Sequence, residues 1–307
     1  MALHGVVQPQ CTKTELTPDS IRRLDYLWDA ENLGIVILEH ICVLAAPFHF
    51  IRNAFWVSAI LTILTQNLGI SLCFHRTLCH KRVEYLLNKS VEYLFAYLGL
   101  LAGQGDPVFW VSVHRFHHQF NFGTAQSMCF KDPHSPIEGF WFSHINWLFQ
   151  HTYLREKCGR RNNVMDLQKQ AYYRFLRRTY PFHVVGLGIL LYVNGGFPCY
   201  IWGMGVRMAV SHHGTFVINS VCHTWGNRPY NTKDLSTNNW LMNLIGGSGE
   251  GWHNNHHAFE FSARLGLEWW QLDLPWYIIK ILKSLGLATN IKVPTEIQKL
   301  EMSFKNQ

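Results

Sequence analysis

The chain is poor in charged residues. Only 15% of its 307 residues are Asp, Glu, Lys or Arg, whereas about a quarter is usual for a soluble domain. The net charge of +7 would suit either nucleic acid or the anionic cytosolic face of a membrane. Because the chain has no block of Lys and Arg and no nucleic-acid-binding motif, we expect no nucleic-acid partner.

The sequence predicts neither paired cysteines nor a targeting signal of the usual kind. None of the eight cysteines forms a CxxC pair, which disfavours a zinc ribbon or a disulfide framework. The first thirty residues contain no apolar core of the signal type, and their Glu15, Asp19 and Asp25 are atypical of a transit peptide. The informative features are therefore long apolar runs and an excess of histidine, with 18 copies.

Two apolar runs predict a first membrane hairpin. Residues 33–50 and 54–74 form runs of 18 and 21 residues, close to the ~20 residues that cross a hydrocarbon core. The "IRN" between them is too short to link separate domains, so we expect two antiparallel helices. Glu39 and His40 interrupt the first run, where ionisable groups are costly.

Two further runs predict a second hairpin. Residues 180–193 and 199–221 are joined by "NGGFP", which is a clear turn signal. Arg207, His212 and His213 lie within the second of these runs. The run over 91–103 is too short to span a membrane well and suits an interfacial or buried helix.

Eight histidines occur in three clusters. "HRTLCH" contributes His75 and His80, whereas "HRFHH" and "HNNHH" share the pattern HxxHH. On a helix, positions i, i+3 and i+4 lie on one face, so each triplet is expected to converge on one point. The triplets are His114, His117 and His118, then His253, His256 and His257. The isolated histidines are interpreted as surface or core residues: His4, His49, His134, His144, His151 and His183.

The clustered histidines predict a metal centre. Eight imidazoles exceed what one four-coordinate zinc needs, and imidazole also suits iron, copper and nickel. This number of ligands fits two metals with open coordination positions. A pair of irons is the best fit. The second ring nitrogen of each ligand needs a hydrogen-bond partner, for which the nearby candidates are Glu250, Asp106, Asp132, Asn254 and Asn255.

The predicted fold is an all-α integral membrane protein. Four transmembrane helices, in two hairpins, are capped by a cytosolic helical domain that holds the histidine-rich dimetal site. Positive-inside bias places both termini in the cytosol, because the opposite side receives little basic charge beyond Arg52. The predicted segments are a cytosolic N-terminal segment (1–32), hairpin 1 (33–74), a cytosolic region (75–180), hairpin 2 (181–222) and a cytosolic C-terminal region (223–307).

The motifs resemble those of the membrane-bound fatty acyl desaturases, within that family the acyl-CoA (stearoyl-CoA type) branch and its plant and algal relatives. The resemblance covers roughly residues 30–295 and rests on "CFHRTLCHK", "GDPVFWVSVHRFHHQF", "DPHSPIEGFWFSHINWLF", "GRRNNVMDL", "NSVCHTWGNRPYNTKD" and "GEGWHNNHHAFEFSARLGLEWWQLD". It implies a ninth histidine ligand at His223 and a water-mediated contact from Asn219. It also implies four transmembrane helices under a cytosolic cap, in agreement with the two hairpins.

The resemblance implies an oxidoreductase that inserts a cis double bond, at Δ9 or nearby, into a saturated acyl chain. The substrate would be an acyl-CoA or an acyl-lipid, with O2 as co-substrate and two Fe ions, although zinc binds such sites readily in recombinant proteins. No electron-donor domain is visible in the sequence. We therefore expect a separate donor, either a b-type cytochrome with its reductase at the endoplasmic reticulum or ferredoxin in a plastid. The short polar N-terminus favours the endoplasmic reticulum.

Tentative substrate contacts are less specific. Trp110 and Trp252, with Trp269 and Trp270, are candidate walls of an acyl tunnel, although tryptophans of membrane proteins are often interfacial anchors. Basic residues that could meet an anionic headgroup, or simply face water, are Lys131, Arg155, Lys157, Arg160 and Arg161.

The link after the second cluster departs from the family pattern. It runs from Gln119 to Lys131, is longer than usual and lacks the expected Asp. It would either alter headgroup recognition or impair the enzyme. Other hypotheses stay open: a diiron lipid hydroxylase, which would use the same oxidant with different positioning, and a non-catalytic metal-binding membrane protein. A zinc hydrolase is disfavoured by the number of ligands.

Overall fold

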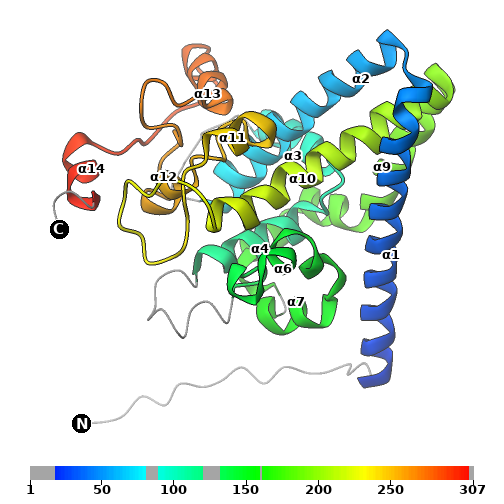
Figure 1. Cartoon of the computed structure of the whole chain (residues 1–307), viewed down its shortest axis with the longest axis horizontal. Helices are drawn as coiled ribbons and strands as arrows, with labels where there is room; N and C mark the ends of the chain where they lie inside the picture. Colours follow the sequence, from blue (N-terminus) through cyan, green and yellow to red (C-terminus); the bar gives the residue numbers. More distant parts are fainter. Residues whose placement is uncertain (1–17, 81–88, 120–131, 160, 304–307) are drawn as a thin grey trace.

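The computed structural model describes residues 18–80, 89–119, 132–159 and 161–303, and these form helices with no strand among them (Figure 1). In chain order the helices are α1 (Pro18–Ala45), η1 (Ala46–His49), α2 (Arg52–Thr62), η2 (Ile63–Cys79), α3 (Lys89–Leu100), α4 (Pro107–Gln119), η4 (Pro136–Glu138), α6 (Phe140–His144), η5 (Asn146–Phe149), α7 (His151–Cys158), η6 (Asn162–Val164), α8 (Met165–Gln168), α9 (Ala171–Tyr200), η7 (Ile201–Val206), α10 (Arg207–Ser220), η8 (Val221–His223), α11 (Trp240–Met242), η9 (Asn243–Gly247), α12 (His253–Ala258), α13 (Leu274–Ser284) and α14 (Glu296–Met302).

Among the described residues, three helical segments are long and apolar enough to cross a membrane. They are Asp25–His49, Arg52–Cys79 and Ala171–His223. The first two correspond to the apolar runs of the first predicted hairpin, although α1 already begins at Pro18 and η2 continues to Cys79. Helical hydrogen bonding therefore extends beyond the apolar residues at both ends of this hairpin.

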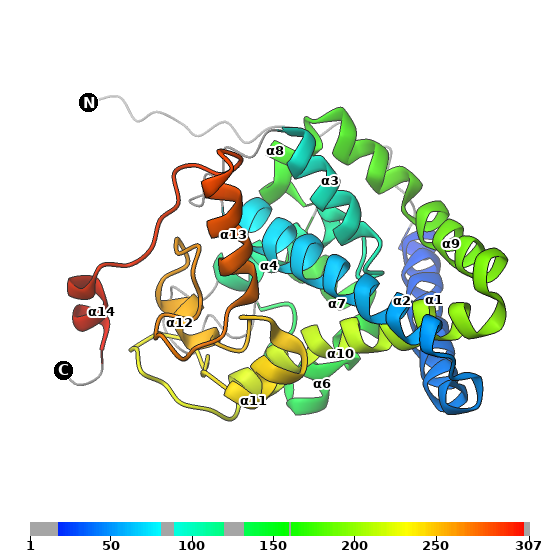
Figure 2. The ribbon, with the colours of Figure 1, turned by 90° about the horizontal axis from the view of Figure 1, so that it is seen from above.

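The third segment contains both runs of the second predicted hairpin. Its "NGGFP" lies inside α9, where Gly196 has φ 64° and ψ −161°, a conformation that only glycine adopts at little cost. The helix direction changes there, and Leu191 packs against Met204 and Met208 beyond the kink. Figure 2 shows the chain turning back at this point, so that the two limbs meet at the kink and diverge from it.

The outer faces of α1 and α9 are apolar. Large apolar patches on a surface usually mark contact with a partner or a membrane. The exposed side chains include Ile37, Ile41 and Leu44 of α1, and Phe182, Val185, Ile189 and Val193 of α9.

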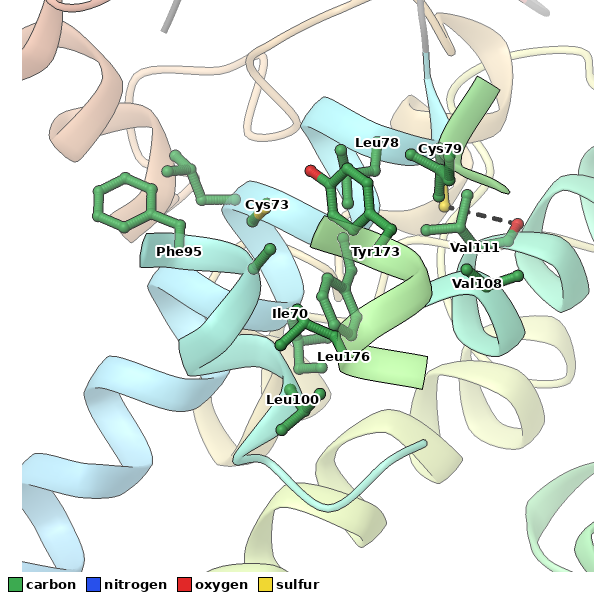
Figure 3. Packing of buried hydrophobic residues seen from close by; sticks show 14 of the residues in the cluster. Ile70, Cys73, Leu78, Cys79, Phe95, Leu100, Val108, Val111, Tyr173 and Leu176 are labelled. Carbon is green, nitrogen blue, oxygen red and sulfur yellow. Dashed lines mark hydrogen bonds between the residues drawn. The ribbon is translucent and has the colours of Figure 1, made fainter. Parts of the chain in front are cut away.

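The main core lies where η2, α3, α4 and α9 meet (Figure 3). Its buried side chains include Phe74, Leu100, Val108 and Tyr173. Tyr173 also donates a hydrogen bond of 2.7 Å to Oε1 of Glu92, a buried carboxylate of α3. The short apolar run over 91–103 was predicted to form a helix, and α3 confirms this for most of the run. The inner face of α3 is buried in the core.

Elements α12, α13 and α14 gather at the end of the molecule away from α1 (Figures 1 and 2). A fully buried arginine, Arg76 of η2, joins this end to the core. Its Nη2 lies 2.8 Å from Asp273 Oδ1 and 3.4 Å from Glu250 Oε1. Asp273 in turn caps α13 by accepting from the backbone N–H of Trp276 at 3.1 Å. One guanidinium therefore fixes η2 relative to the C-terminal region.

Close packing of η2 on α3 makes Gly69 sensitive to substitution. A Cβ atom there would lie 2.3 Å from the backbone nitrogen of Gly99. We expect Gly69→Ala to destabilise the protein by about 1–3 kcal/mol, because overpacking displaces backbone. The matched control is Gly34→Ala in α1, whose Cβ would meet nothing within 4 Å. Thermal midpoints in detergent would test this, and equal midpoints for the two variants would contradict it.

Candidate metal centre

All nine predicted histidine ligands are brought together. His75 lies in η2 and His80 directly follows it, while α4, η8 and α12 carry the remaining rings. The rings form two groups in which one nitrogen per ring lies within 4.8 Å of all the others. The first group is His75, His80, His114, His118 and His256, and the second is His117, His223, His253 and His257.

The prediction that each HxxHH triplet converges on one point was wrong. In α4, His114 and His118 join the first group, whereas His117 joins the second. In α12, His253 and His257 join the second group and His256 the first. The reason is helical geometry. Positions i and i+4 are separated by about 40° around the helix axis, whereas position i+3 lies about 100° from position i+4. Each triplet therefore serves both groups.

Separations between ring nitrogens fit metal coordination. The Nε2 atom of His256 lies 3.0 Å from that of His75 and 2.9 Å from that of His118. In the second group, the Nε2 atoms of His253 and His257 are 3.0 Å apart. Two ligands bound at right angles to one metal, each at about 2.1 Å, would be separated by about 3 Å.

The tautomers require positive charge between the rings. His117 and His257 direct their Nδ1 atoms at carboxylates, 3.1 Å from Asp132 Oδ2 and 2.5 Å from Asp234 Oδ2. A carboxylate favours hydrogen on the nitrogen that faces it, and in the neutral rings this leaves the two Nε2 atoms with lone pairs. Those Nε2 atoms face each other at 3.3 Å. A metal ion bound by both nitrogens would remove this repulsion.

His223 supports the same conclusion. Its Nδ1 lies 3.2 Å from the carbonyl oxygen of Ile218, so its Nε2 is the free acceptor. That buried Nε2 has no hydrogen-bond partner among the residues that the structure describes. Buried polar atoms are nearly always satisfied, and a metal ion would satisfy this one.

Carboxylates surround the two groups and hold the rings. Two of the predicted partners are confirmed: Glu250 Oε2 lies 2.7 Å from His75 Nδ1, and Asp132 holds His117. Two partners were missed by the sequence analysis. Asp234 holds His257, and Glu260 Oε1 lies 3.1 Å from His118 Nδ1.

In the described part of the chain, the other three predicted partners form hydrogen bonds away from the rings. Asp106 caps α4, accepting from the backbone N–H of Val108 at 2.8 Å. Asn254 bonds both backbone polar groups of Tyr230, and Asn255 bonds Asn238. The two asparagines thus fix the backbone that carries the third histidine cluster, because their side chains point away from the ring nitrogens.

Charge in the centre is divided between neutral rings and ionised carboxyl groups. Burial raises the pKa of Asp132 and Asp234, but the adjacent His117 and His257 outweigh burial and lower both pKa values below the usual range of a carboxyl group. Burial, together with neighbouring imidazoles, lowers the pKa of five rings well below the usual value: His80, His114, His118, His253 and His256. These rings are therefore in the neutral form that binds metal.

Comparison with known proteins identifies the family. The family model described as "Fatty acid desaturase" matches residues 52–282. The chain is 57% identical over 267 residues to the acyl-CoA C20 Delta5-desaturase of Anemone leveillei, covering 87% of this chain and 83% of the relative. The chain belongs to the fatty acid desaturase family, as its resemblance predicted.

Relatives of this desaturase differ in the positions and carriers that their names give. The chain is 52% identical over 280 residues to the chloroplastic palmitoyl-monogalactosyldiacylglycerol delta-7 desaturase of Arabidopsis thaliana, covering 90% of this chain and 73% of the relative. It is 51% identical over 283 residues to delta-9 acyl-lipid desaturase 1 of the same plant, covering 92% and 88%. The chain thus combines a candidate metal centre with membership of a family of oxidoreductases that act on acyl chains.

Three adjoining cavities lead away from the histidines of the desaturase. A metal-side cavity of about 50 Å³ is lined by His75, His117 and His253 among others. It shares Trp110 and Asn219 with a central cavity of about 250 Å³. The central cavity shares lining residues with an apolar cavity of about 700 Å³ between α1 and α9.

The structure places the proposed substrate residues in different surroundings. Trp110 stacks on His114, with ring centroids 5.1 Å apart, and lines two cavities. Trp252 is buried elsewhere and donates to the carbonyl oxygen of Leu272 at 2.8 Å. Trp269 is 88% exposed, and Arg155 forms an ion pair with Asp25 at 2.7 Å. The proposed contacts of Arg160 and Lys131, with most of the lengthened link, fall outside the described residues.

The structure also shows the surroundings of the histidines outside the three clusters. His134 is not an independent core residue, because its ring lies 4.6 Å from that of His117 and its Nδ1 lies 3.5 Å from Asp132 Oδ1. Burial lowers the pKa of His134 to about 4, although Asp132 opposes this shift. His151 and His183 have contacts away from the metal centre, and His49 is exposed.

Asp234 is expected to control metal affinity through His257. We expect Asp234→Asn to weaken metal binding by about 10–100-fold, as is typical when a hydrogen-bond partner of a ligand is lost. The matched control is Glu296→Gln, whose carboxylate is 82% exposed and pairs only with Lys299 among the described contacts. Elemental analysis of purified protein would measure metal per chain. Equal metal content in the two variants would contradict the assigned role of Asp234.

Proposed function

We propose that this protein is a fatty acyl desaturase that inserts a cis double bond, at Δ9 or nearby, into a saturated acyl chain. The observation that carries this proposal is the convergence of nine histidines into two groups in a member of the desaturase family. The groups differ from a zinc hydrolase site, because they supply far more imidazoles than one zinc uses.

The bound metals in this proposal are two irons. The first and second groups would each hold one iron, with Asn219 contributing to the second through water. Iron supplies the oxygen chemistry needed to remove two hydrogens from a methylene pair. The surrounding carboxylates favour two divalent cations, because Asp132, Asp234, Glu250 and Glu260 can balance four positive charges.

The chain's own side chains would position the acyl chain. The three adjoining cavities form a path from the rings toward the apolar faces of α1 and α9, and Trp110 lines the part nearest His114. Trp110 is held by donation from Nε1 to Gln104 Oε1 at 3.1 Å. A fixed wall matters because the carbon nearest the metals is the carbon that reacts. The proposal also includes Trp252, Arg155 and Arg160 as substrate contacts.

The topology in this proposal has four transmembrane helices. The kink at Gly196 divides the third apolar segment into two limbs, which supports the boundaries 33–74 and 181–222 for the hairpins. Residues 1–32, 75–180 and 223–307 would then be cytosolic. The partners would be an acyl-CoA or acyl-lipid and a separate electron donor, a b-type cytochrome with its reductase or ferredoxin. We place the protein in the endoplasmic reticulum, with the plastid membrane as the alternative because some relatives are named chloroplastic.

Expression of the full chain in a host that lacks desaturases tests the function directly. We expect a new cis-monounsaturated fatty acid, whose double-bond position is measured by mass spectrometry. His256→Ala should abolish both bound iron and product, because this ring lies within 3.0 Å of two others in the first group. The matched control, His49→Ala, removes an exposed imidazole and should retain both.

Other products would contradict the proposal in distinct ways. A hydroxylated fatty acid would identify a lipid hydroxylase. Iron-loaded protein in the membrane, without any modified fatty acid, would favour a non-catalytic metal-binding protein. Product formation by His256→Ala would refute its role as a ligand.

The junction between the central and apolar cavities should select chain length. Ile35 of α1 lines both cavities, so Ile35→Trp is expected to obstruct the path and shift products toward shorter chains by at least two carbons. Ile37→Trp is the matched control, because Ile37 lies on the same helix but is 52% exposed. The fatty-acid profiles of both variants in the same host measure the shift. An unchanged profile for Ile35→Trp would exclude this path.

A further inference from the structure

A second cluster of metal-ligating side chains lies apart from the nine histidines. It consists of Glu39 and His40 of α1 and His213 of α10. One ligand atom from each of the three residues lies within 4.8 Å of the others. Ionisable groups within an apolar span are costly and usually functional, and desaturation does not account for these.

Hydrogen bonding fixes the tautomer of His40. Its Nδ1 lies 2.7 Å from the carbonyl oxygen of Val36. A carbonyl only accepts, so Nδ1 carries the hydrogen and Nε2 presents a lone pair in the neutral ring. This Nε2 lies 3.2 Å from Nε2 of His213.

A short relay fixes His213 in the same way. The hydroxyl of Ser220 donates to the carbonyl oxygen of Phe216 at 2.8 Å, so its oxygen accepts from Nδ1 of His144 at 2.9 Å. His144 Nε2 is then an acceptor and takes the hydrogen of His213 Nδ1, 3.1 Å away. The two Nε2 atoms of His40 and His213 therefore face each other as lone pairs.

The carboxylate of Glu39 lies beside this pair of rings and forms an ion pair with His212. Glu39 is 2% exposed, and its Oε2 accepts from His212 Nδ1 at 2.8 Å. His212 is also held by the carbonyl oxygen of Gly103, 3.1 Å from its Nε2. The remaining oxygen, Oε1, is buried without a hydrogen-bond partner in the described part of the chain, and it lies 3.9 Å from His40 Nδ1. Metal-binding carboxylates are commonly held in this manner through one oxygen.

We propose that Glu39, His40 and His213 bind a Zn²⁺ ion at a site separate from the nine-histidine centre. Two imidazoles and one carboxylate, with an open fourth position, are a common zinc ligand set. The Nε2 separation of 3.2 Å is close to the ~3.3 Å expected for tetrahedral ligands at about 2.0–2.1 Å. The ion would join α1 to α10 beside the apolar cavity, which Glu39 also lines.

Zinc binding to the purified, iron-loaded full chain in detergent tests this site without measuring desaturation. The probe is Zn²⁺ alone, with bound zinc and retained iron determined by elemental analysis. We expect one zinc per chain in addition to unchanged iron. His40→Ala should weaken this binding at least tenfold, and its side chain is 47% exposed, so no core cavity is created. Glu39→Gln should also weaken it, because the amide is a poorer zinc ligand.

His49→Ala is the matched control, since it removes an exposed histidine from the end of the same apolar segment. It should bind zinc as the unaltered chain does, and zinc should raise the thermal midpoint of both. Equal zinc binding by His40→Ala and His49→Ala would overturn the proposal. A chain that retains its iron but binds no zinc would also overturn the proposal. That result would indicate that His40 and His213 share a proton between their Nε2 atoms.

Discussion

Repulsion between ring nitrogens is the constraint on which the centre of this desaturase depends. His117 and His257 each direct Nδ1 at a carboxylate, and their Nε2 atoms face each other at 3.3 Å. In a low-dielectric interior such a contact is unfavourable unless positive charge lies between the atoms. Metal ions bound between the rings would relieve this repulsion, whereas apolar packing alone would not.

The scaffold holds this arrangement through a few rigid junctions. Gly69 allows η2 to approach the backbone of α3, and Arg76 then ties η2 to Asp273 at the start of α13. Asn255 fixes the backbone of α12 from the opposite side through Asn238 and Gln271. These contacts position histidines that are far apart in the sequence without placing any of them on a long flexible loop.

Much of this organisation could be predicted from the sequence. The spacing of the histidines identified eight rings, the family pattern added His223, and the apolar runs identified the long helices. Partners of the rings were harder to predict. Asp234 and Glu260 reach His257 and His118 only through the tertiary fold, whereas Asp106 has the right chemistry but is used as a helix cap. Each HxxHH triplet is divided between the two groups because of the angles around the helix axis. Treating the three positions as one helical face neglected these angles.

That division has a consequence for how the centre is filled. Helix α4 presents rings to both groups, and so does α12. An ion captured by one group would restrict the motion of the same two helices that must be ordered for the other group. Because the first ion would have met part of that ordering cost, the second would bind to a better-prepared site. Metal uptake should therefore be cooperative, with chains carrying a single ion less abundant than independent sites would give.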